Sequence, residues 1–369
     1  MKILITGSKG FVGKNLIAEL RNQGFNDLLE FDVDTNPALL DDYARDCSFV
    51  FHLAGVNRPV EQSEFMAGNF GFTSILLQAL QNHNNKAPVL ITSSTQAALQ
   101  NSYGLSKRAG EDLIFEYGKE KGVQVFVYRL PNVFGKWCRP NYNSGVATFC
   151  HNIANELPIQ VNDPEVMMNL VYIDDVIASL IGKLKNGSDN QGTFDTVEPV
   201  HTIKLGEIVK LIYDFKESRQ NLLLPDLGDA FTKKLYSTYL SYLPVDKFSY
   251  LLKTNVDERG SFTEFIKSPD RGQVSINTSK PGITKGNHWH HTKNEKFLVV
   301  SGIGVIRFRK VDSTEIIEYH VSGEKPEVVD IPVGYTHNIQ NLGHTDMVTV
   351  MWVNEIFDID KPDTYFEKV

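Results

Sequence analysis

A tyrosine and a lysine four residues apart are suited to proton transfer at a carbonyl group. Tyr103 and Lys107 lie in a segment expected to be helical, so their side chains would share one face of the helix. A lysine ammonium beside a phenol favours the phenolate, and we therefore expect it to lower the pKa of Tyr103, which makes the phenol a usable general acid. The strand expected upstream ends in hydroxyl side chains that can reach the same carbonyl: Thr92, Ser93, Ser94 and Thr95.

A glycine-rich loop directly follows the first expected strand. The loop and the start of the next helix contain Gly7, Ser8, Lys9, Gly10, Phe11, Val12 and Gly13. Gly7 permits a tight turn, Gly10 lets the backbone approach a pyrophosphate, and Gly13 lets the helix pack closely on the strand. The helix start then offers N–H groups to the phosphates. Asp32 ends the second expected strand, where a carboxylate can bind a ribose hydroxyl. The spacing predicts a dinucleotide-binding site.

A third group of residues is suited to metal binding. His288 and His290 would point to the same face of a strand, because side chains alternate along a strand with a period of two. Glu295 and His337 can complete a site with nitrogen and oxygen ligands, of the kind that zinc, iron or manganese accept. We expect a divalent metal here, with zinc as the first choice.

Two parts of the sequence, which differ in their pattern of apolar residues, must position these groups. Short apolar runs alternate with helical stretches over the first half of the chain, at residues 2–6, 27–31, 48–53, 89–93 and 123–130. This alternation predicts a doubly wound parallel sheet with helices on both faces. From about residue 262, short strands separated by Gly and Pro predict an all-β sandwich or barrel. We place the boundary within residues 237–252 and expect domains at residues 1–245 and 246–369.

Composition narrows the function further. The net charge of −8 argues against general binding of nucleic acids, which requires clustered Lys and Arg. No apolar run is long enough to span a bilayer, and the first residues do not resemble a signal peptide. Three cysteines form neither a disulfide framework nor a zinc motif. We therefore expect a cytoplasmic protein.

Residues 1 to about 240 resemble extended short-chain dehydrogenases/reductases, the branch that acts on nucleotide sugars. The supporting segments, besides the glycine loop and the Tyr103–Lys107 pair, are residues 51–55, 69–73, 128–135 and 170–176. The resemblance implies a Rossmann domain whose cofactor contacts include Leu53, Ala54, Gly55, Asn69 and Leu130 along with Tyr103 and Lys107. It also implies that Ser94 is the catalytic hydroxyl. Ser94 precedes Tyr103 by only nine residues, fewer than is usual in the family, and Ser93 stays an alternative.

The choice between NADH and NADPH rests on two side chains with opposite charges. Asp32 would repel a 2′-phosphate and favour NAD. Lys9 would attract that phosphate, and the family resemblance also implies NADP. We expect NADPH, with Asp32 turned away or offset by Lys9.

Residues 255–369 resemble cupins, and residues 257–265 resemble the start of the deoxysugar 3,5-epimerase branch. In that branch a histidine acts as base, here His288, and a basic residue at the position of Lys296 helps to stabilise an enolate. The branch usually carries a catalytic tyrosine on a later strand, where this chain has Trp352 and its neighbours. His288 is thus either a metal ligand or a base, and the sequence leaves both roles open.

The combination of the two halves resembles bifunctional enzymes of capsular polysaccharide biosynthesis on the route to UDP-N-acetyl-L-fucosamine. The implied substrate is UDP-2-acetamido-2,6-dideoxy-L-arabino-hexos-4-ulose: the cupin would epimerise C3, and the reductase would reduce the C4 ketone with NADPH. The alternatives are an epimerase that recycles its nicotinamide cofactor and a non-catalytic sensor of sugar nucleotides. Dehydration is disfavoured, because Thr95 and Gln96 stand where dehydratases carry an Asp-Glu pair. We expect a homodimer or a higher homo-oligomer.

Overall fold

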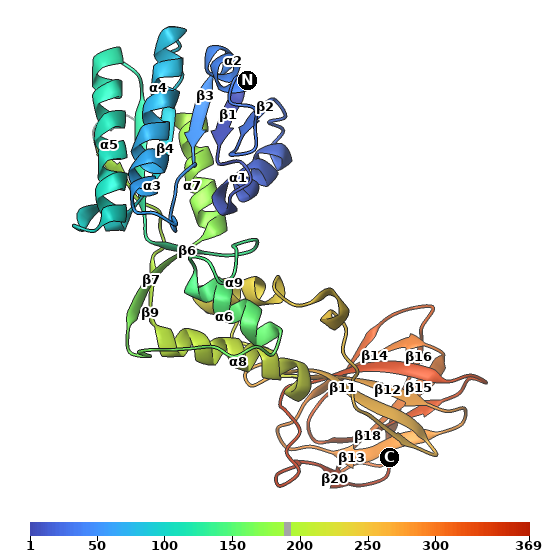
Figure 1. Cartoon of the computed structure of the whole chain (residues 1–369). Helices are drawn as coiled ribbons and strands as arrows, with labels where there is room; N and C mark the ends of the chain where they lie inside the picture. The colour runs from blue at the N-terminus through green and yellow to red at the C-terminus, as the bar shows by residue number, and fades with distance from the viewer. Residues whose placement is uncertain (188–192) are drawn as a thin grey trace. The chain divides into compact units, whose positions relative to one another are not determined.

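The computed structural model describes residues 1–187 and 193–369 (Figure 1). The chain divides into two compact units. The N-terminal unit comprises Met1–Tyr213 and Asp229–Pro244, and the C-terminal unit comprises Asp214–Gly228 and Val245–Val369. The domain boundary expected at residue 245 stays a prediction, and the two units are described one at a time below.

A parallel sheet forms the centre of the N-terminal unit. Its strands, in spatial order, are β2 (Leu28–Phe31), β1 (Ile3–Thr6), β3 (Phe49–His52), β4 (Val89–Ser94), β5 (Val125–Leu130) and β8 (Phe194–Asp195). Every neighbouring pair runs parallel. The predicted parallel sheet is therefore confirmed.

Helices cover both faces of this sheet (Figure 1). The helices on one face are α1 (Phe11–Asn22) and α7 (Ile173–Asn186), and those on the other are α2 (Leu39–Asp46), α4 (Phe72–Asn82) and α5 (Ser102–Lys121). Ile3 and Ile5 pack under the first pair, whereas Leu4 packs under the second group, as the alternation of side chains along a strand requires. Shorter turns of helix connect these elements: α3 (Ser63–Met66), η1 (Ala67–Gly71) and η2 (Thr95–Ala98).

The strand order reverses direction at β1. The chain passes from β1 to β2 on one side and then crosses to β3 on the other side of β1. In open α/β sheets, ligands bind outside the carboxyl ends of the strands at such a switch point. The loops that follow β1 and β3, which carry the glycine loop and residues 53–55, therefore stand at the place where a ligand is expected.

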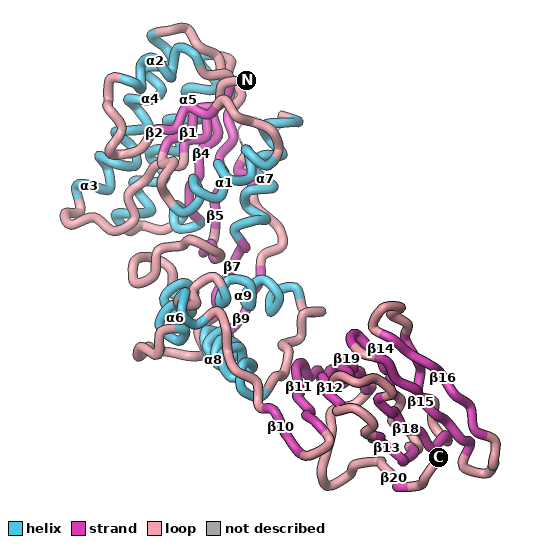
Figure 2. The backbone as a smooth tube through the Cα atoms, turned by 90° about the vertical axis from the view of Figure 1, so that its right-hand side faces the viewer, coloured by secondary structure: helices cyan, strands magenta, loops and turns pink. Residues whose placement is uncertain are grey.

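A smaller sheet and its helices complete the N-terminal unit (Figure 2). The strands are β6 (Asn132–Phe134), β7 (Met167–Tyr172) and β9 (His201–Lys204), and the helices are α6 (Gly145–Ala154), α9 (Ala230–Leu240) and the first part of α8 (Leu205–Asn221). Among the helices of the described residues, none is both long enough and apolar enough to cross a bilayer.

Two antiparallel sheets build most of the C-terminal unit, which also contains the last part of α8 and a short helix, η3 (Val245–Lys247). One sheet has the order β10 (Thr254–Asp257), β11 (Gly260–Ser268), β12 (Gly272–Ser279), β19 (Met347–Val353), β14 (Glu295–Ser301) and β17 (Val328–Ile331). The other has the order β16 (Ile316–Ser322), β15 (Ile303–Lys310), β18 (Tyr335–Asn341), β13 (Thr284–Trp289) and β20 (Tyr365–Phe366). The expectation of an all-β second half is confirmed, and closure into a barrel stays a prediction.

The interior of the C-terminal unit is apolar on one side and polar on the other. Phe297 and Val299 of one sheet pack against Ile306 and Ile339 of the other. The buried face of β12, in contrast, carries Gln273, Ser275, Asn277 and Ser279. Buried polar groups need hydrogen-bond partners, so this side of the interior suits a polar ligand better than an apolar one.

Candidate active sites

The glycine loop packs tightly against the loop that follows the neighbouring strand β3. Gly7 has a φ of +71°, which favours glycine, and a β-carbon there would lie 2.7 Å from the main-chain nitrogen of Ala54. A β-carbon on Gly13 would lie 2.2 Å from the carbonyl oxygen of Gly7, so α1 approaches the loop this closely only because residue 13 is glycine. The loops after β1 and β3 thus form one surface.

The start of α1 has the features of a phosphate site. Gly10 is the N-cap, and a β-carbon on it would lie 3.1 Å from the Gly7 carbonyl oxygen. Among the described side chains none caps this helix, so N–H groups of its first turn can bind an anion. Phe11 and Val12 turn their side chains toward the core and Ser8 is buried, which leaves main-chain contacts for these three. The loop therefore fits the pyrophosphate of a dinucleotide.

Asp32 is held by the glycine loop itself. One of its carboxylate oxygens accepts a hydrogen bond from the Lys9 main-chain N–H at 2.7 Å, and the other accepts from the Val33 N–H at 2.8 Å. The Lys9 ammonium pairs with Asp34 rather than with Asp32, and the Lys9 side chain is 62% exposed. The charge of Asp34 therefore bears on the choice between NADH and NADPH, in addition to the charges of Asp32 and Lys9.

A buried histidine links the ends of β1 and β3. His52 is 1% exposed, and its Nδ1 and Nε2 lie 2.7 Å and 2.8 Å from the hydroxyls of Thr6 and Thr73. The Thr73 hydroxyl donates to the Asn69 carbonyl at 2.6 Å, so its oxygen must accept from His52 Nε2–H. Nδ1 then accepts from Thr6. Burial lowers the pKa of His52 to about 3, which agrees with this neutral form.

Asn69 extends the same network to the catalytic helix. Its side chain accepts from the Val56 N–H at 2.9 Å and donates to the Ser106 hydroxyl at 2.9 Å. Ser106 in turn donates to the main-chain carbonyl of Tyr103 at 2.8 Å. Hydrogen bonds therefore run without a break from the end of β1 to the first turn of α5. Asn69, expected to contact the cofactor, is 4% exposed and carries this connection.

Tyr103 and Ser94 meet at the carboxyl end of β4. Asn101 caps α5 by accepting from the Gly104 N–H at 2.7 Å, which places Tyr103 in the first turn. A β-carbon on Gly104 would lie 2.2 Å from the Gln96 carbonyl oxygen, so α5 can start directly against the turn that follows Ser94. The Ser94 hydroxyl lies near the Tyr103 phenol. Phenol and hydroxyl can thus contact one carbonyl oxygen together.

The pKa of Tyr103 differs from the expectation. Burial raises the pKa of the phenol, and the nearby Ser94 hydroxyl opposes this only in part. The Lys107 ammonium, which was expected to lower that pKa, donates instead to the main-chain carbonyl of Thr92 at 3.1 Å. Burial also lowers the pKa of Lys107 to about 8, with Glu111 acting in the opposite direction. Desolvation therefore sets the direction of the pKa shift of both groups.

The neighbouring hydroxyl, Ser93, points to the other side of β4. It donates to the buried carboxylate of Glu111 at 2.5 Å, and Arg129 binds the same carboxylate at 2.6 Å and 3.0 Å. Of the two serines weighed from the sequence, Ser94 is the one brought to Tyr103. Leu130, expected near the cofactor, lies opposite Ser94 on β5 with its side chain in the core.

The four residues expected to bind a metal come together in the C-terminal unit. The potential ligand atoms of His288, His290, Glu295 and His337 all lie within 4.8 Å of one another. His288 and His290 come from β13 and its end, Glu295 begins β14, and His337 lies on β18 beside His288. Three strands from both sheets therefore contribute to one cluster.

Buried atoms without partners indicate that this cluster suits a metal. Within the described residues, His290 Nε2, Glu295 Oε2 and both ring nitrogens of His337 lack an aligned hydrogen bond. His337 Nε2 nevertheless lies 3.1 Å from Glu295 Oε2. Burial raises the pKa of Glu295, but His290 and His337 outweigh it and lower the pKa to about 2. An ionised carboxylate beside imidazoles is a donor set for zinc or a similar ion.

His288 is the least tightly held member of the cluster. It is partly exposed, whereas His290 is 3% and His337 1% exposed. Burial and then the neighbouring His337 lower the pKa of His288 to about 4. The imidazole is therefore neutral near pH 7, as both a metal ligand and a base must be.

Lys296 is not brought to this cluster. It follows Glu295 directly on β14, so it points to the opposite face of the sheet, where its exposed ammonium pairs with Asp330. Trp352 lies opposite Lys296 on β19 and donates its indole N–H to the Arg271 carbonyl at 2.9 Å. Neither residue reaches the interior that the histidines face.

A different lysine, missed in the sequence, does face the interior. Lys285 lies on β13 opposite the core residue Ile339, as His288 lies opposite His337. Since residues 337 and 339 share one face of β18, Lys285 and His288 point the same way. Between them Asn287 adopts a φ of +63° in a bulge. This bulge resets the alternation, so residues three apart share a face.

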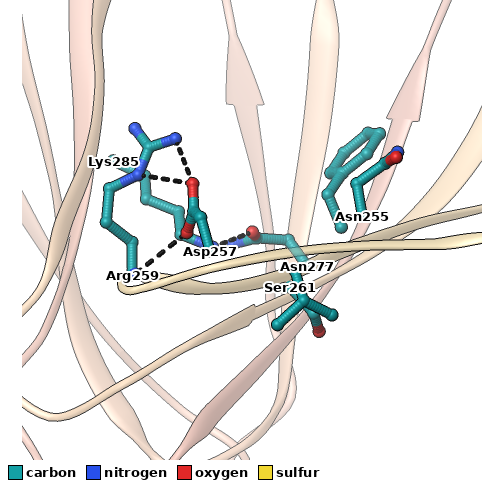
Figure 3. A pocket seen from close by; sticks show the side chains of 8 residues that line it. Asn255, Asp257, Arg259, Ser261, Asn277 and Lys285 are labelled. Atoms are coloured by element: carbon teal, nitrogen blue, oxygen red, sulfur yellow. Dashed lines mark hydrogen bonds and ion pairs between the residues drawn. The ribbon is translucent and has the colours of Figure 1, made fainter.

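Lys285 lines a polar pocket of about 320 Å³ (Figure 3). Its ammonium donates to the Asn277 side chain and the Thr278 carbonyl, both at 2.8 Å. Beside Lys285, Arg259 holds Asp257 at 2.6 Å and 3.0 Å (Figure 3). Burial lowers the pKa of Lys285, and Asp257 opposes this. The pocket combines two cations with amide and carboxylate groups, a lining suited to a polar, anionic ligand.

Fold and sites together define a class of protein. The chain belongs to the NAD dependent epimerase/dehydratase family, whose model matches residues 3–194. A second model, the Polysaccharide biosynthesis C-terminal domain, matches residues 255–365. The chain is accordingly a member of a group of nucleotide-sugar reductases and epimerases.

Individual relatives narrow this class. The chain is 46% identical to a UDP-2-acetamido-2,6-beta-L-arabino-hexul-4-ose reductase from Pseudomonas aeruginosa, over 99% of this chain and 98% of the relative. The crystal structure of the capsular polysaccharide assembling protein CapF from Staphylococcus aureus covers both chains fully, with 57% identity and a TM-score of 0.95. A UDP-glucuronic acid 4-epimerase from Bacillus cereus, solved with NAD, shares the fold at 18% identity and a TM-score of 0.55, over 66% of this chain and 96% of that chain.

Proposed function

We propose that the N-terminal unit reduces the C4 ketone of a UDP-linked 4-keto-6-deoxy sugar with NADPH, and that the C-terminal unit is a metal-binding cupin that epimerises C3 of the same sugar. The observation that carries the proposal is the approach of the Ser94 hydroxyl to the Tyr103 phenol, one helical turn from the buried Lys107. Ser94 ends the strand β4 and Tyr103 and Lys107 follow it on α5, at the same edge of the sheet as the glycine loop. The relative from Pseudomonas aeruginosa, named for such a reduction, supports this substrate class.

In the reduction, NADPH, when bound, supplies the hydride to C4 of the sugar. The electron pair of the C=O bond moves to oxygen, and the Tyr103 hydroxyl gives that oxygen its proton. Ser94 donates a second hydrogen bond to the developing oxyanion. Lys107 is placed to bind the nicotinamide ribose, and the phenolate left on Tyr103 is then reprotonated from solvent.

In the epimerisation, the ketone at C4 makes the proton on C3 acidic. A base removes this proton, the C–H electron pair delocalises onto the C4 oxygen as an enolate, and a proton added from the opposite face inverts C3. His288, neutral near pH 7, is our first candidate for the base. His290, Glu295 and His337 would hold a metal ion, which when bound supplies positive charge near the site.

The two activities share one ketone, which explains their presence in one chain. We propose UDP-2-acetamido-2,6-dideoxy-L-arabino-hexos-4-ulose as the substrate, within capsular polysaccharide biosynthesis. The similarity to CapF, a capsular polysaccharide assembling protein, supports this setting. We further propose that the protein works in the cytoplasm. We also propose that it forms a homodimer or a higher homo-oligomer, and light scattering of the purified protein tests this oligomeric state.

Product analysis by NMR with the full chain tests both halves. With the keto sugar and NADPH, we expect one equivalent of NADPH to be oxidised for each sugar reduced at C4. In D2O without NADPH, we expect deuterium at C3 of the recovered keto sugar. Product without net oxidation of NADPH would instead indicate an epimerase that recycles its cofactor, and binding of the sugar without any turnover would indicate a sensor.

Removal of the metal separates the two roles open to His288. If chelated protein still exchanges the C3 proton and His288→Ala abolishes this exchange, His288 is the base and the metal is structural. If the chelated protein exchanges nothing and added metal restores exchange, the metal takes part in the epimerisation. If neither the metal-containing parent nor the reloaded protein exchanges the C3 proton, the proposed epimerase activity is refuted.

A further inference from the structure

The segment of residues 362–369 packs directly on the metal cluster. Its short strand β20 pairs with β13, so that Phe366 lies opposite His288 and Tyr365 lies opposite Trp289. This segment is separated by some seventy positions in sequence from the histidines it contacts, and it belongs to neither of the two motifs that carry the cluster.

Asp363 contacts the ligand His290 through its main chain. The Asp363 carbonyl oxygen lies 2.5 Å from His290 Nδ1. A carbonyl can only accept, so Nδ1 carries a proton, and in the neutral form of the ring the free lone pair is that of Nε2. That Nε2 is buried, lies 3.6 Å from Glu295 Oε2 and has no aligned hydrogen bond within the described residues. One carbonyl thus fixes which nitrogen of His290 faces the cluster.

The Asp363 side chain holds the turn between two of the ligands. Its carboxylate accepts from the main-chain N–H groups of His291, Thr292 and Lys293 at 2.9–3.0 Å, and from the Thr292 hydroxyl at 3.2 Å. These residues connect His290 to Glu295. Burial raises the pKa of the Asp363 carboxyl, but the three N–H donors outweigh it and hold that pKa well below its usual range. The turn is therefore wrapped around one ionised carboxylate.

Contacts on both sides keep Asp363 in place. Before it, Lys293 Nζ donates to the Pro362 carbonyl. After it, the Glu367 carboxylate binds Arg309 at 2.6 Å, and the Thr336 hydroxyl donates to the Glu367 carbonyl. The segment is thus anchored to β15 and β18, which flank the cluster.

We propose that Asp363 is a positioning residue of the metal centre: its carbonyl sets the tautomer and orientation of His290, and its carboxylate sets the turn that brings His290 and Glu295 together. This inference rests on the metal binding proposed above. Groups that hydrogen-bond the far nitrogen of a metal-bound histidine fix its tautomer, and their loss weakens metal affinity about 10- to 100-fold.

Metal affinity of the full-length protein tests this role. We expect Asp363→Ala to weaken Zn²⁺ binding, measured by chelator competition, about 10- to 100-fold. Both variants keep the main-chain carbonyl, but Asp363→Asn also keeps one side-chain acceptor oxygen for the turn, and we expect a smaller loss. Asp360→Asn, an exposed change on the same stretch of chain, serves as the matched control and should bind Zn²⁺ as the parent does. Co²⁺ spectra should change for both Asp363 variants and not for the control.

The parent protein supplies a second measurement that needs no variant at residue 363. Histidine ¹⁵N NMR of metal-free protein should show His290 protonated at Nδ1. Protonation at Nε2 alone, or Zn²⁺ affinity of Asp363→Ala and Asp363→Asn within twofold of the parent, would overturn the proposal. If the parent and His337→Ala bind Zn²⁺ equally weakly, the metal centre itself is refuted. Normal NADPH binding by the variants would show that the N-terminal unit is intact.

Discussion

Gly55 and Lys107 approach so closely that residue 55 has no room for a side chain. A β-carbon on Gly55 would lie 3.0 Å from Lys107 Nζ and 2.9 Å from Asn69 Oδ1. Both of these atoms are buried and engaged, Lys107 with the Thr92 carbonyl and Asn69 with the Val56 N–H. The loop after β3 thus fixes the position of the Lys107 ammonium.

We expect Gly55→Ala to displace Lys107 and Asn69, because neither can yield without losing a buried hydrogen bond. The affinity for NADPH and kcat should each fall about tenfold or more, corresponding to about 1.4 kcal/mol each. Gly182→Ala, where nothing lies within 4 Å of the new methyl group, provides the control and should change neither. Parent-like NADPH binding by Gly55→Ala would show that Lys107 does not need this position.

Tyr103→Phe should separate proton donation from cofactor binding. Loss of the hydroxyl should lower kcat for ketone reduction by about 10²- to 10⁴-fold, the usual range for a general acid. NADPH binding, measured by fluorescence titration, should stay within a few-fold of the parent. Lys107→Ala should lose both activity and cofactor affinity. Turnover by the Phe variant at the parent rate would remove Tyr103 from the mechanism.

The cofactor preference should respond in opposite directions to Lys9 and Asp34. Lys9 is exposed and paired with Asp34, and Asp32 is held by the Lys9 main-chain N–H. We expect kcat/KM to favour NADPH over NADH. Lys9→Ala should narrow this ratio, because a cation near the 2′-phosphate is lost, and Asp34→Asn should widen it, because the same cation is no longer neutralised. A higher kcat/KM with NADH in the parent would refute the preference.

His52 should make the N-terminal unit sensitive to mild acid. Its pKa is about 3 in the folded protein and about 6.5 when unfolded, so the unfolded state binds more protons between these values. Stability is therefore complete above pH 6.5 and falls as the pH drops toward 3, by about 1.4 kcal/mol per unit, or about 2 kcal/mol at pH 5. The protection factors of amides in β1 and β3, corrected for the pH dependence of intrinsic exchange, should fall accordingly.

A glutamine at position 52 tests this assignment. It keeps one donor and one acceptor but does not titrate, so His52→Gln should flatten the pH dependence of these protection factors between pH 7 and 5. His320→Gln changes an exposed histidine on β16 and should leave that dependence unaltered. An equal pH dependence in His52→Gln and the parent would assign the acid sensitivity to other groups.

Sequence patterns predicted the fold well where the structure depends on residues that are neighbours in the sequence. Strands expected at residues 2–6 and 48–53 appear as β1 and β3, because their continuous apolar runs suit a sheet buried on both faces. The pKa of Tyr103 was predicted in the wrong direction, because desolvation depends on the surroundings in the folded state. Asp363 gave no signal, since its contacts with the turn after His290 arise only through the fold.

Lys296 and Lys285 show where period-two alternation predicts the direction of a side chain and where it fails. Period-two alternation alone predicts that Lys296, next to the inward Glu295, points outward, and the structure places it there. The same rule applied to Lys285, three residues before His288, predicts opposite faces. The bulge at Asn287 reverses that result, and a left-handed asparagine within a strand is not evident from the types of its neighbours.

Exchange of the C3 proton distinguishes the two lysines. Without NADPH, an enolate at C4 can form only if positive charge or hydrogen-bond donors face its oxygen, and loss of one such donor typically costs about 10²- to 10³-fold in rate. Lys285 faces the same side of β13 as His288 and lines the polar pocket (Figure 3). We therefore expect Lys285→Met to slow deuterium incorporation at C3 about 100-fold.

Two variants serve as controls. The Lys296 ammonium pairs with Asp330 on the outside, so exchange by Lys296→Met should stay within twofold of the parent. Tyr103→Phe, defective only in reduction, should exchange at the parent rate and shows that the assay reports the C-terminal unit alone. Equal exchange by Lys285→Met and the parent, with loss in Lys296→Met, would instead restore the assignment made from the sequence and would require β14 to present its outer face to the sugar.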